Sequence, residues 1–218
     1  MSKYLICYEG GEGKLIAKKS EFCADIFSVH SEEEVNECLE KIKKKYWDAN
    51  HHCYAYIIGN DGPGSDIKKF SDDGEPSQTA GKPMMDVLEA EGIHDCLVVV
   101  TRYFGGTLLG TGGLVRAYQG ACKDGLAHSV IVERTHGCLL NYTVDYDLYG
   151  RLQRLADSGA FRIINTDFAE KITLTLAVDK SSSQNIIDKV EEISAAKALL
   201  NKAEDAYYII INNKVEII

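Results

Sequence analysis

Two arginines that flank a run of glycines form the part of this sequence best suited to chemistry. An apolar run ends at Arg102 and leads into a glycine-rich loop, and Arg116 follows in a segment with helical periodicity. Glycines let backbone N–H groups approach a ligand closely, and the start of a helix favours anions. The guanidinium groups would add a planar fork for a phosphate or carboxylate. The loop glycines are Gly105, Gly106, Gly110, Gly112 and Gly113.

A second polar stretch, residues 71–83, combines carboxylates, hydroxyls and a lysine. Asp72 and Asp73 can coordinate Mg²⁺ or act as acid and base, but Asp before Gly more often hydrogen-bonds its own backbone. A structural alternative stays open for both stretches, in which the arginines pair with Asp72, Asp73 or Glu75 and the glycines only adopt positive φ angles. The candidate binding residues are Ser71, Asp72, Asp73, Glu75, Ser77, Thr79, Lys82, Arg102, Tyr103 and Arg116, together with the loop glycines.

Standard nucleotide-binding motifs are incomplete in both stretches. A dinucleotide fingerprint that starts at Gly110 needs a glycine where Val115 stands. A P-loop that ends at Lys82 needs glycine at Pro76 and a hydroxyl residue at Pro83. The sequence therefore argues against a standard nucleoside triphosphatase, and we expect no cofactor.

Adjacent histidines precede a cysteine at residues 51–53 and suggest metal binding. Neighbouring residues on a strand point to opposite faces, so at most His51 and Cys53 share a face. The sequence offers no second ligand pair at the usual zinc spacing. We therefore expect no metal site.

Composition limits the classes of partner. The 218 residues carry a net charge of −9, and both parts of the chain are acidic when it is divided at Gly137. This balance argues against a protein that coats nucleic acid, so any such contact must be a local patch, and we expect no DNA partner. Seven scattered cysteines, short apolar runs and a start without the features of a signal peptide predict a cytoplasmic protein with no membrane contact.

Local patterns in the first 134 residues predict strands and helices in alternation. Ser31 followed by Glu34 is a capping box that marks the start of a helix. A second helix begins near Pro83 and ends at Gly92, and residues 60–64 have the composition of a loop. The expected strands are 4–8, 15–17, 22–29, 53–59 and 95–101, and a third helix covers 114–126.

The pattern restarts after Arg134. Strands at 139–146, 161–166, 172–178 and 207–211, with helices at 148–156 and 183–193, give the order β-α-β-β-α-β of a ferredoxin-like unit. We therefore predict an α+β protein with one domain at 1–134 and another at 137–218. An outward face of the second sheet is expected to carry Asn141, Thr143, Asp145, Thr173 and Thr175.

Several segments of the first domain form a set: residues 19–22, 51–56, 71–82, 102–106, 109–114 and 116–118. This set resembles the signature of the IMPACT/YigZ family. The likeness covers essentially the whole first domain, and the second domain is similar to the small ferredoxin-like domain of bacterial members. One departure stands out, because Gln78 occupies a position where the family pattern usually has glycine.

The resemblance implies a fold for each domain and a role in translation. It implies a first domain with a split β-α-β fold, like the second domain of a small-subunit ribosomal protein. It implies a second domain like those of ribosomal elongation factors. Eukaryotic relatives regulate translation by opposing activation of a kinase that phosphorylates an initiation factor. No established reaction comes with the bacterial type.

We predict a non-enzymatic, translation-associated regulator that contacts RNA, the ribosome or a translation-related protein. Its expected contact surface is one cleft that joins Arg102, Arg116 and the turn at 72–75. An alternative is an enzyme that acts on a small phosphorylated or carboxylated substrate in this cleft, with Asp73 or Glu75 transferring a proton. A third hypothesis is a protein-binding module that uses the sheet of the second domain.

Overall fold

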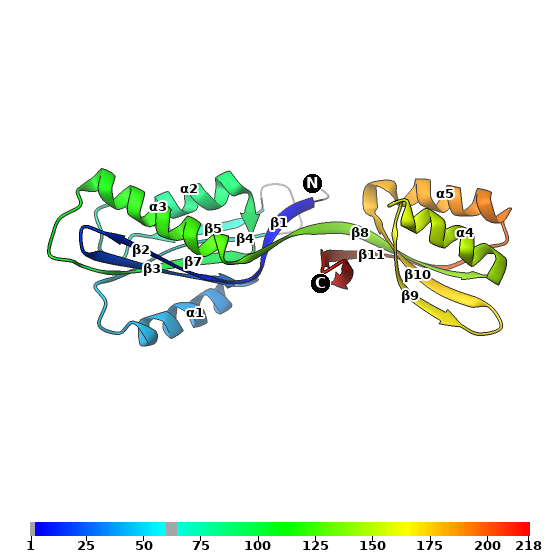
Figure 1. Cartoon of the computed structure of the whole chain (residues 1–218), viewed down its shortest axis with the longest axis horizontal. Coiled ribbons are helices and arrows are strands. Elements are labelled where there is room, and N and C mark those ends of the chain that lie inside the picture. The colour runs from blue at the N-terminus through cyan, green and yellow to red at the C-terminus, as the bar shows by residue number, and fades with distance from the viewer. Residues whose placement is uncertain (1–2, 60–64) are drawn as a thin grey trace. The chain divides into compact units, whose positions relative to one another are not determined.

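A computed structural model describes residues 3–59 and 65–218 (Figure 1). The chain divides into two compact units, one of residues Tyr4–Val132 and another that contains Glu133–Ile218. The loop expected at 60–64 lies outside the described residues. Among the described residues, no helix is both long and apolar enough to cross a membrane. The mixed α+β class predicted from the sequence is confirmed.

A five-stranded antiparallel sheet in the order β2-β3-β7-β4-β5 organises the first unit. The central strand β7 is almost wholly buried, as its unbroken apolar sequence predicts for a strand covered on both faces. A short parallel pair, β1 with β6, belongs to the same unit. The strands are β1 (Lys3–Glu9), β2 (Glu12–Ala17), β3 (Ser20–Ser28), β4 (His51–Ile58), β5 (Ile67–Ser71), β6 (Ile93–His94) and β7 (Cys96–Tyr103).

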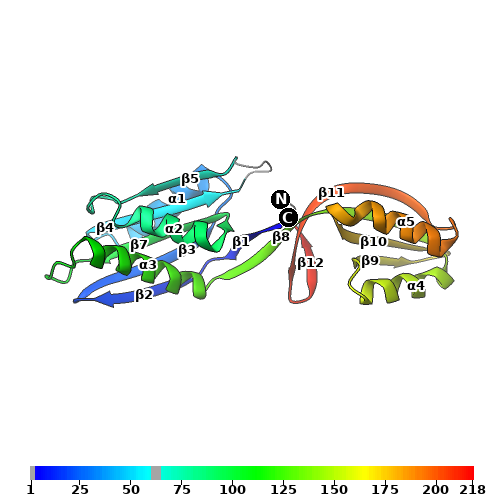
Figure 2. The same ribbon diagram turned by 90° about the horizontal axis from the view of Figure 1, so that it is seen from above.

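Three helices cover the two faces of this sheet. Helices α2 (Gly81–Glu91) and α3 (Thr111–Ala127) lie side by side on one face, and α1 (Glu32–Lys45) covers the other (Figures 1 and 2). The predicted capping box is confirmed, since the Ser31 hydroxyl accepts from the backbone N–H of Glu34. The predicted end of α2 is also confirmed, because Gly92 adopts the left-handed conformation there.

The second unit shows the element order β-α-β-β-α-β followed by one more strand. Its antiparallel sheet has the order β9-β10-β8-β11-β12. Helices α4 and α5 lie on one face of it and enclose an apolar core. The elements are β8 (Val130–Val144), α4 (Tyr146–Asp157), β9 (Arg162–Phe168), β10 (Ile172–Asp179), a 3-10 turn (Lys180–Ser182), α5 (Ser183–Ser194), β11 (Leu199–Ile211) and β12 (Lys214–Ile217).

Several details differ from the sequence-based expectations. The two units divide after Val132, close to the boundary expected between 134 and 137, but strand β8 continues through this division without interruption. The same strand ends at Val144, so Asp145 precedes α4 instead of lying on the sheet, and it pairs with Lys171 at 3.4 Å. The expected polar face exists without it: Asn141 Nδ2 donates to the Thr175 hydroxyl at 3.3 Å.

Candidate functional site

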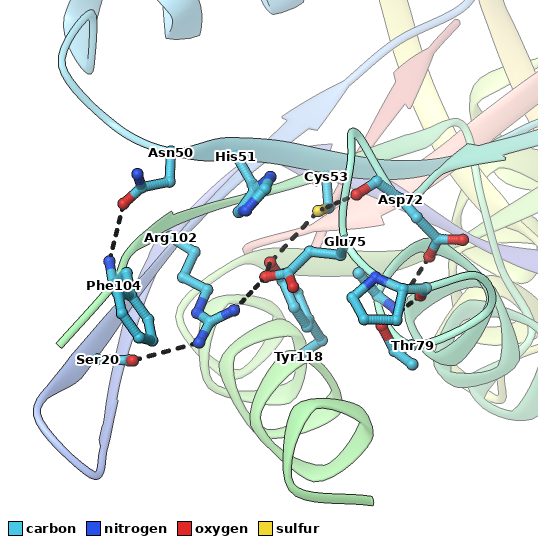
Figure 3. A network of polar contacts seen from close by, with 12 residues as sticks. Ser20, Asn50, His51, Cys53, Asp72, Glu75, Thr79, Arg102, Phe104 and Tyr118 are labelled. Carbon is cyan, nitrogen blue, oxygen red and sulfur yellow. Dashed lines mark hydrogen bonds and ion pairs between the residues drawn. The ribbon is translucent and has the colours of Figure 1, made fainter. Parts of the chain in front are cut away.

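Arg102 lies near the end of the central strand β7, opposite Phe22 of β3 and His51 of β4. Its Nη1 donates to Glu75 Oε1 at 2.6 Å, and its Nη2 donates to the Ser20 hydroxyl at 3.4 Å (Figure 3). The Arg102 and Glu75 side chains are only 6% and 3% exposed. The two polar stretches of the sequence therefore meet, but in a closed ion pair.

This geometry corrects the expectation of an open cleft around Arg102. The guanidinium of Arg102 is already paired with the carboxylate of Glu75, as in the structural alternative in which the arginines pair with acids. Aromatic rings cover more of that group, with its carbon 5.3 Å from the centre of Phe22 and 5.5 Å from that of Phe104. One donor is left over, because the buried Nε of Arg102 has no hydrogen-bond partner among the described residues.

Tyr118 binds Glu75 directly, and Cys53 is linked to Glu75 only through Tyr118. The Tyr118 hydroxyl donates to Glu75 Oε1 at 2.8 Å, and Cys53 Sγ lies 3.3 Å from that hydroxyl (Figure 3). Burial raises the pKa of both Tyr118 and Cys53, so both groups stay protonated at neutral pH. They therefore act as neutral hydrogen-bond donors within a buried network.

The Asp72 carboxylate binds backbone N–H groups of the protein and is not open to a ligand. Its Oδ1 accepts from the N–H groups of Ala80 and Gly81 at 3.0 and 2.8 Å, and its Oδ2 accepts from Gln78 at 2.7 Å. Three N–H groups at and before the start of α2 are thus satisfied by one carboxylate. No cluster of three or more metal-ligating side chains is found among the described residues.

Asp73 joins this turn to strand β4. Its Oδ2 accepts from the backbone N–H of His52 at 2.7 Å, and its carbonyl oxygen lies 2.7 Å from His51 Nδ1. His52 Nδ1 contacts the Thr101 hydroxyl at 3.1 Å. Burial lowers the pKa of His52, against the opposing effect of Asp73. The histidines therefore help to fix the turn.

Gln78 has φ of 61°, in the left-handed region that favours glycine. Its side chain is exposed, while its backbone N–H donates to Asp72. A glycine at this position would relieve strain without loss of that bond. At position 78, the contact with Asp72 is therefore made by the backbone N–H and not by the side chain.

The glycine-rich loop packs against the turn between β2 and β3. A Cβ on Gly105 would lie 2.1 Å from the carbonyl carbon of Lys19, so only glycine fits. The Gly105 N–H donates to the Ser20 hydroxyl at 3.1 Å. Helix α3 then begins without a side-chain cap, since its N-cap residue is Gly110. The exposed part of the loop lies between these two glycines.

The other candidate residues are distributed around this network. Lys82 pairs with Asp86 at 2.5 Å, and the Tyr103 hydroxyl donates to Asp48 at 2.9 Å. The buried Thr79 donates to the carbonyl of Pro76. The Ser71 hydroxyl accepts from the N–H of Asp73. The remaining candidates are exposed or half-buried: Ser77, Gly106, Gly112, Gly113 and Arg116.

Two side chains that contact Arg102 and Glu75, Ser20 and Tyr118, were not among the residues singled out from the sequence. Both are buried, and a buried polar group needs a hydrogen-bond partner. This requirement predicts that each of them has a hydrogen-bond partner, but it does not identify that partner. The segments that contain them were noted only as part of the family resemblance.

Comparisons with known proteins cover both units. Residues 18–126 match the family model described as Impact N-terminal domain. Residues 143–197 match the model described as Domain of unknown function (DUF1949). The IMPACT family member YvyE of Bacillus subtilis is 34% identical over 207 residues, which cover 95% of this chain and 94% of that protein. YigZ of Escherichia coli is 33% identical over 190 residues, with 86% and 92% covered.

Solved structures give a consistent result. A crystal structure described as that of a hypothetical protein is 31% identical and superposes with a TM-score of 0.58 over 92% of this chain and 97% of that one. A structure of the two-domain translational regulator Yih1 covers 56% of this chain and 48% of its own, with 26% identity and a TM-score of 0.40. A score that low carries no argument about function.

Proposed function

Because this chain belongs to the IMPACT family, as its motifs indicated, we propose that it is a translation-associated regulator without catalytic turnover. It contacts RNA, the ribosome or a translation-related protein. The link to translation rests on what the family resemblance implies. The absence of turnover rests on the geometry around Arg102.

The closed polar network is the observation that carries this proposal. A catalytic base or nucleophile needs an accessible group with a pKa matched to its task. Here Glu75 is engaged by Arg102 and Tyr118, and Asp72 by three backbone N–H groups. The raised pKa of Cys53 disfavours the thiolate. Such a network supports rigid presentation of a neighbouring surface.

The surface that this network supports is the exposed loop from Phe104 to the start of α3. Leu108 is 81% exposed and Phe104 is 47% exposed, so the loop presents two large apolar side chains to solvent. Exposed Arg116 follows on α3, and Lys18 Nζ contacts the carbonyl of Leu108 at 3.4 Å. We assign the partner contact to this apolar and basic loop surface.

One observation favours the alternative proposal of an enzyme. The partnerless Nε of Arg102 and the uncapped start of α3 at Gly110 are donors suited to a small phosphorylated or carboxylated substrate. Binding of that kind would have to displace Glu75 from Arg102. The cost of separating a buried pair makes this the weaker proposal.

Finer assignments of the two units form part of the same proposal. We assign 1–134 to an IMPACT-type domain with the split β-α-β fold of a ribosomal-protein domain. We assign 137–218 to a ferredoxin-like domain similar to those of elongation factors. The strand order β9-β10-β8-β11, with both helices on one face, supports the second assignment. Seven cysteines without a disulfide support a reducing, cytoplasmic location.

Sedimentation of the full chain with purified ribosomes tests the proposal. We expect binding that weakens in a Leu108→Asp, Arg116→Glu variant and persists in a Lys171→Glu control on the second unit. A panel of phosphorylated and carboxylated metabolites, followed by mass spectrometry, tests the alternative. Conversion of any of them, with no ribosome binding, would favour the enzyme.

A further inference from the structure

Helices α4 and α5 lie side by side over the sheet of the second unit (Figure 2). A groove of about 550 Å³ runs between them. Its lining comes from both helices and from the residue that follows α4. The lining residues are Arg151, Arg154, Leu155, Ser158, Lys189, Glu192 and Ile193.

Three cations and one carboxylate line this groove, although the unit as a whole is acidic. Arg151 donates to the carbonyl of Ile193 at 3.2 Å, and Arg154 donates to that of Gly150 at 3.2 Å. Within the described second unit, neither arginine nor Lys189 forms an ion pair with a carboxylate. Their charges therefore stay available to an anionic partner.

Three other lysines of the same unit do form ion pairs with carboxylates. Lys171, Lys180 and Lys202 pair with Asp145, Asp205 and Glu204, respectively. One acid, Glu192, lines the groove itself, and Asp188 on α5 accepts from Gln184 at 2.8 Å. The groove is thus a local basic site in an acidic unit.

The apolar residues of the groove decide which polyanion fits. Leu155 and Ile193 are half-buried and pack against the core of the unit, so each presents part of its surface to the groove. An apolar side chain of a protein partner can cover them, whereas a sugar-phosphate backbone gains nothing there. None of the lining residues is aromatic, so nucleic-acid bases would find no stacking platform.

We propose that the groove between α4 and α5 binds an acidic amphipathic segment of a partner protein. Apolar side chains of that segment cover Leu155 and Ile193, and its carboxylates pair with Arg151, Arg154 and Lys189. Charge complementarity carries the choice of partner, because the groove is basic while the unit around it repels extended polyanions. The inference does not depend on the translational role of the first unit.

Fluorescence anisotropy with the full chain tests this. The probes are a labelled peptide that alternates leucine and glutamate at helical spacing, the same peptide with lysine in place of glutamate, and a single-stranded RNA of mixed sequence. We expect the acidic peptide alone to bind, more weakly at about 300 mM than at about 50 mM salt. An Arg151→Glu, Lys189→Glu variant should lose at least about tenfold in affinity.

An Arg162→Glu, Lys197→Glu variant makes the same charge change outside the groove and should bind like the wild type. Melting temperatures of both variants confirm that they fold, and Arg154→Gln provides a milder change within the groove. Equal loss in the groove and control variants would overturn the proposal. So would preferential binding of the RNA, or no binding of the acidic peptide.

Discussion

Arg102 donates from Nη1 to Oε1 of Glu75 at 2.6 Å, across 27 residues of sequence. Both side chains are almost completely buried, and Tyr118 donates to the same carboxylate oxygen. The pair attaches the polar stretch at 71–83 to β7, the central strand of the sheet. It therefore has a structural role that the sequence alone leaves undecided, since either arginine could meet any of three acids.

Replacement of Arg102 tests this role. An exposed, anion-binding arginine would contribute little to stability, but Arg102 is buried in an ion pair. The variant leaves Glu75 buried without its cation, so we predict a loss of roughly 3–5 kcal/mol in the free energy of unfolding. Exposed Arg116→Ala is the matched control and should change it by less than about 0.5 kcal/mol. Urea denaturation measures both.

A double variant separates a lost pair from a lost packing contact. Arg102→Met with Glu75→Met removes both charges and should be less destabilised than Arg102→Ala. Equal stability of wild type and Arg102→Ala would show that the ion pair does not form in solution.

Gln78→Gly should stabilise the protein. A side chain at φ of 61° is strained by about 1 kcal/mol, and glycine relieves this strain while keeping the N–H that donates to Asp72. The neighbouring Ser77→Gly adds chain entropy with no strain to relieve, so it should be neutral or destabilising. Thermal melting compares the two. A lower melting temperature for Gln78→Gly than for wild type would contradict the assigned backbone conformation.

His52 should contribute to acid sensitivity. Burial lowers its pKa below the ordinary 6.5, so below that value the unfolded chain binds more protons than the folded one. The stability linked to His52 is therefore complete above pH 6.5 and is lost as the pH falls through the depressed folded value. His52→Asn keeps a partner for the Thr101 hydroxyl and should flatten this part of the curve. Measurement of the free energy of unfolding against pH tests this. Parallel curves for the wild type and His52→Asn would show that His52 does not contribute to acid sensitivity.

Two glycines near the loop should respond oppositely to alanine. Gly105→Ala places a Cβ 2.1 Å from backbone of Lys19 and should destabilise the protein by at least about 1–3 kcal/mol. Gly112 lies in the first turn of α3, and a Cβ there meets only Arg116 Nη1 at an ordinary 3.7 Å. Gly112→Ala should therefore stabilise by about 0.5–1 kcal/mol. Chemical denaturation of both variants checks the contrast.

Much of the fold follows from local signals in the sequence. The capping box at Ser31, the glycine at the end of α2 and the apolar run of β7 each have a local physical cause, and each was confirmed. Strand β5 was missed because Lys68 and Lys69 make an edge strand look like a polar loop. The full length of β8 was missed because the polar residues 133–136 interrupt its apolar pattern.

The candidate site was harder to predict, because it depends on the register in which the strands of the sheet pair. Whether Arg102 is exposed or buried depends on which residues of β3 and β4 lie opposite it, and that is a tertiary property. The same holds for Asp72, whose three N–H partners lie six to nine residues away, beyond an ordinary Asx-turn. For Arg102 the sequence left three possible acidic partners, and for Asp72 it indicated no backbone partner beyond its own turn.

A reconstituted translation reaction tests the central claim most directly, because it reports function without assuming a partner. The rate of peptide synthesis is measured as the full chain is added at increasing concentration. The account predicts a saturable change in rate. That change should be abolished by Leu108→Asp with Arg116→Glu, and retained by Arg102→Met with Glu75→Met if this variant is folded. An unchanged rate at every concentration of the wild-type chain, or loss of the effect only in the Arg102 and Glu75 variant, would contradict it.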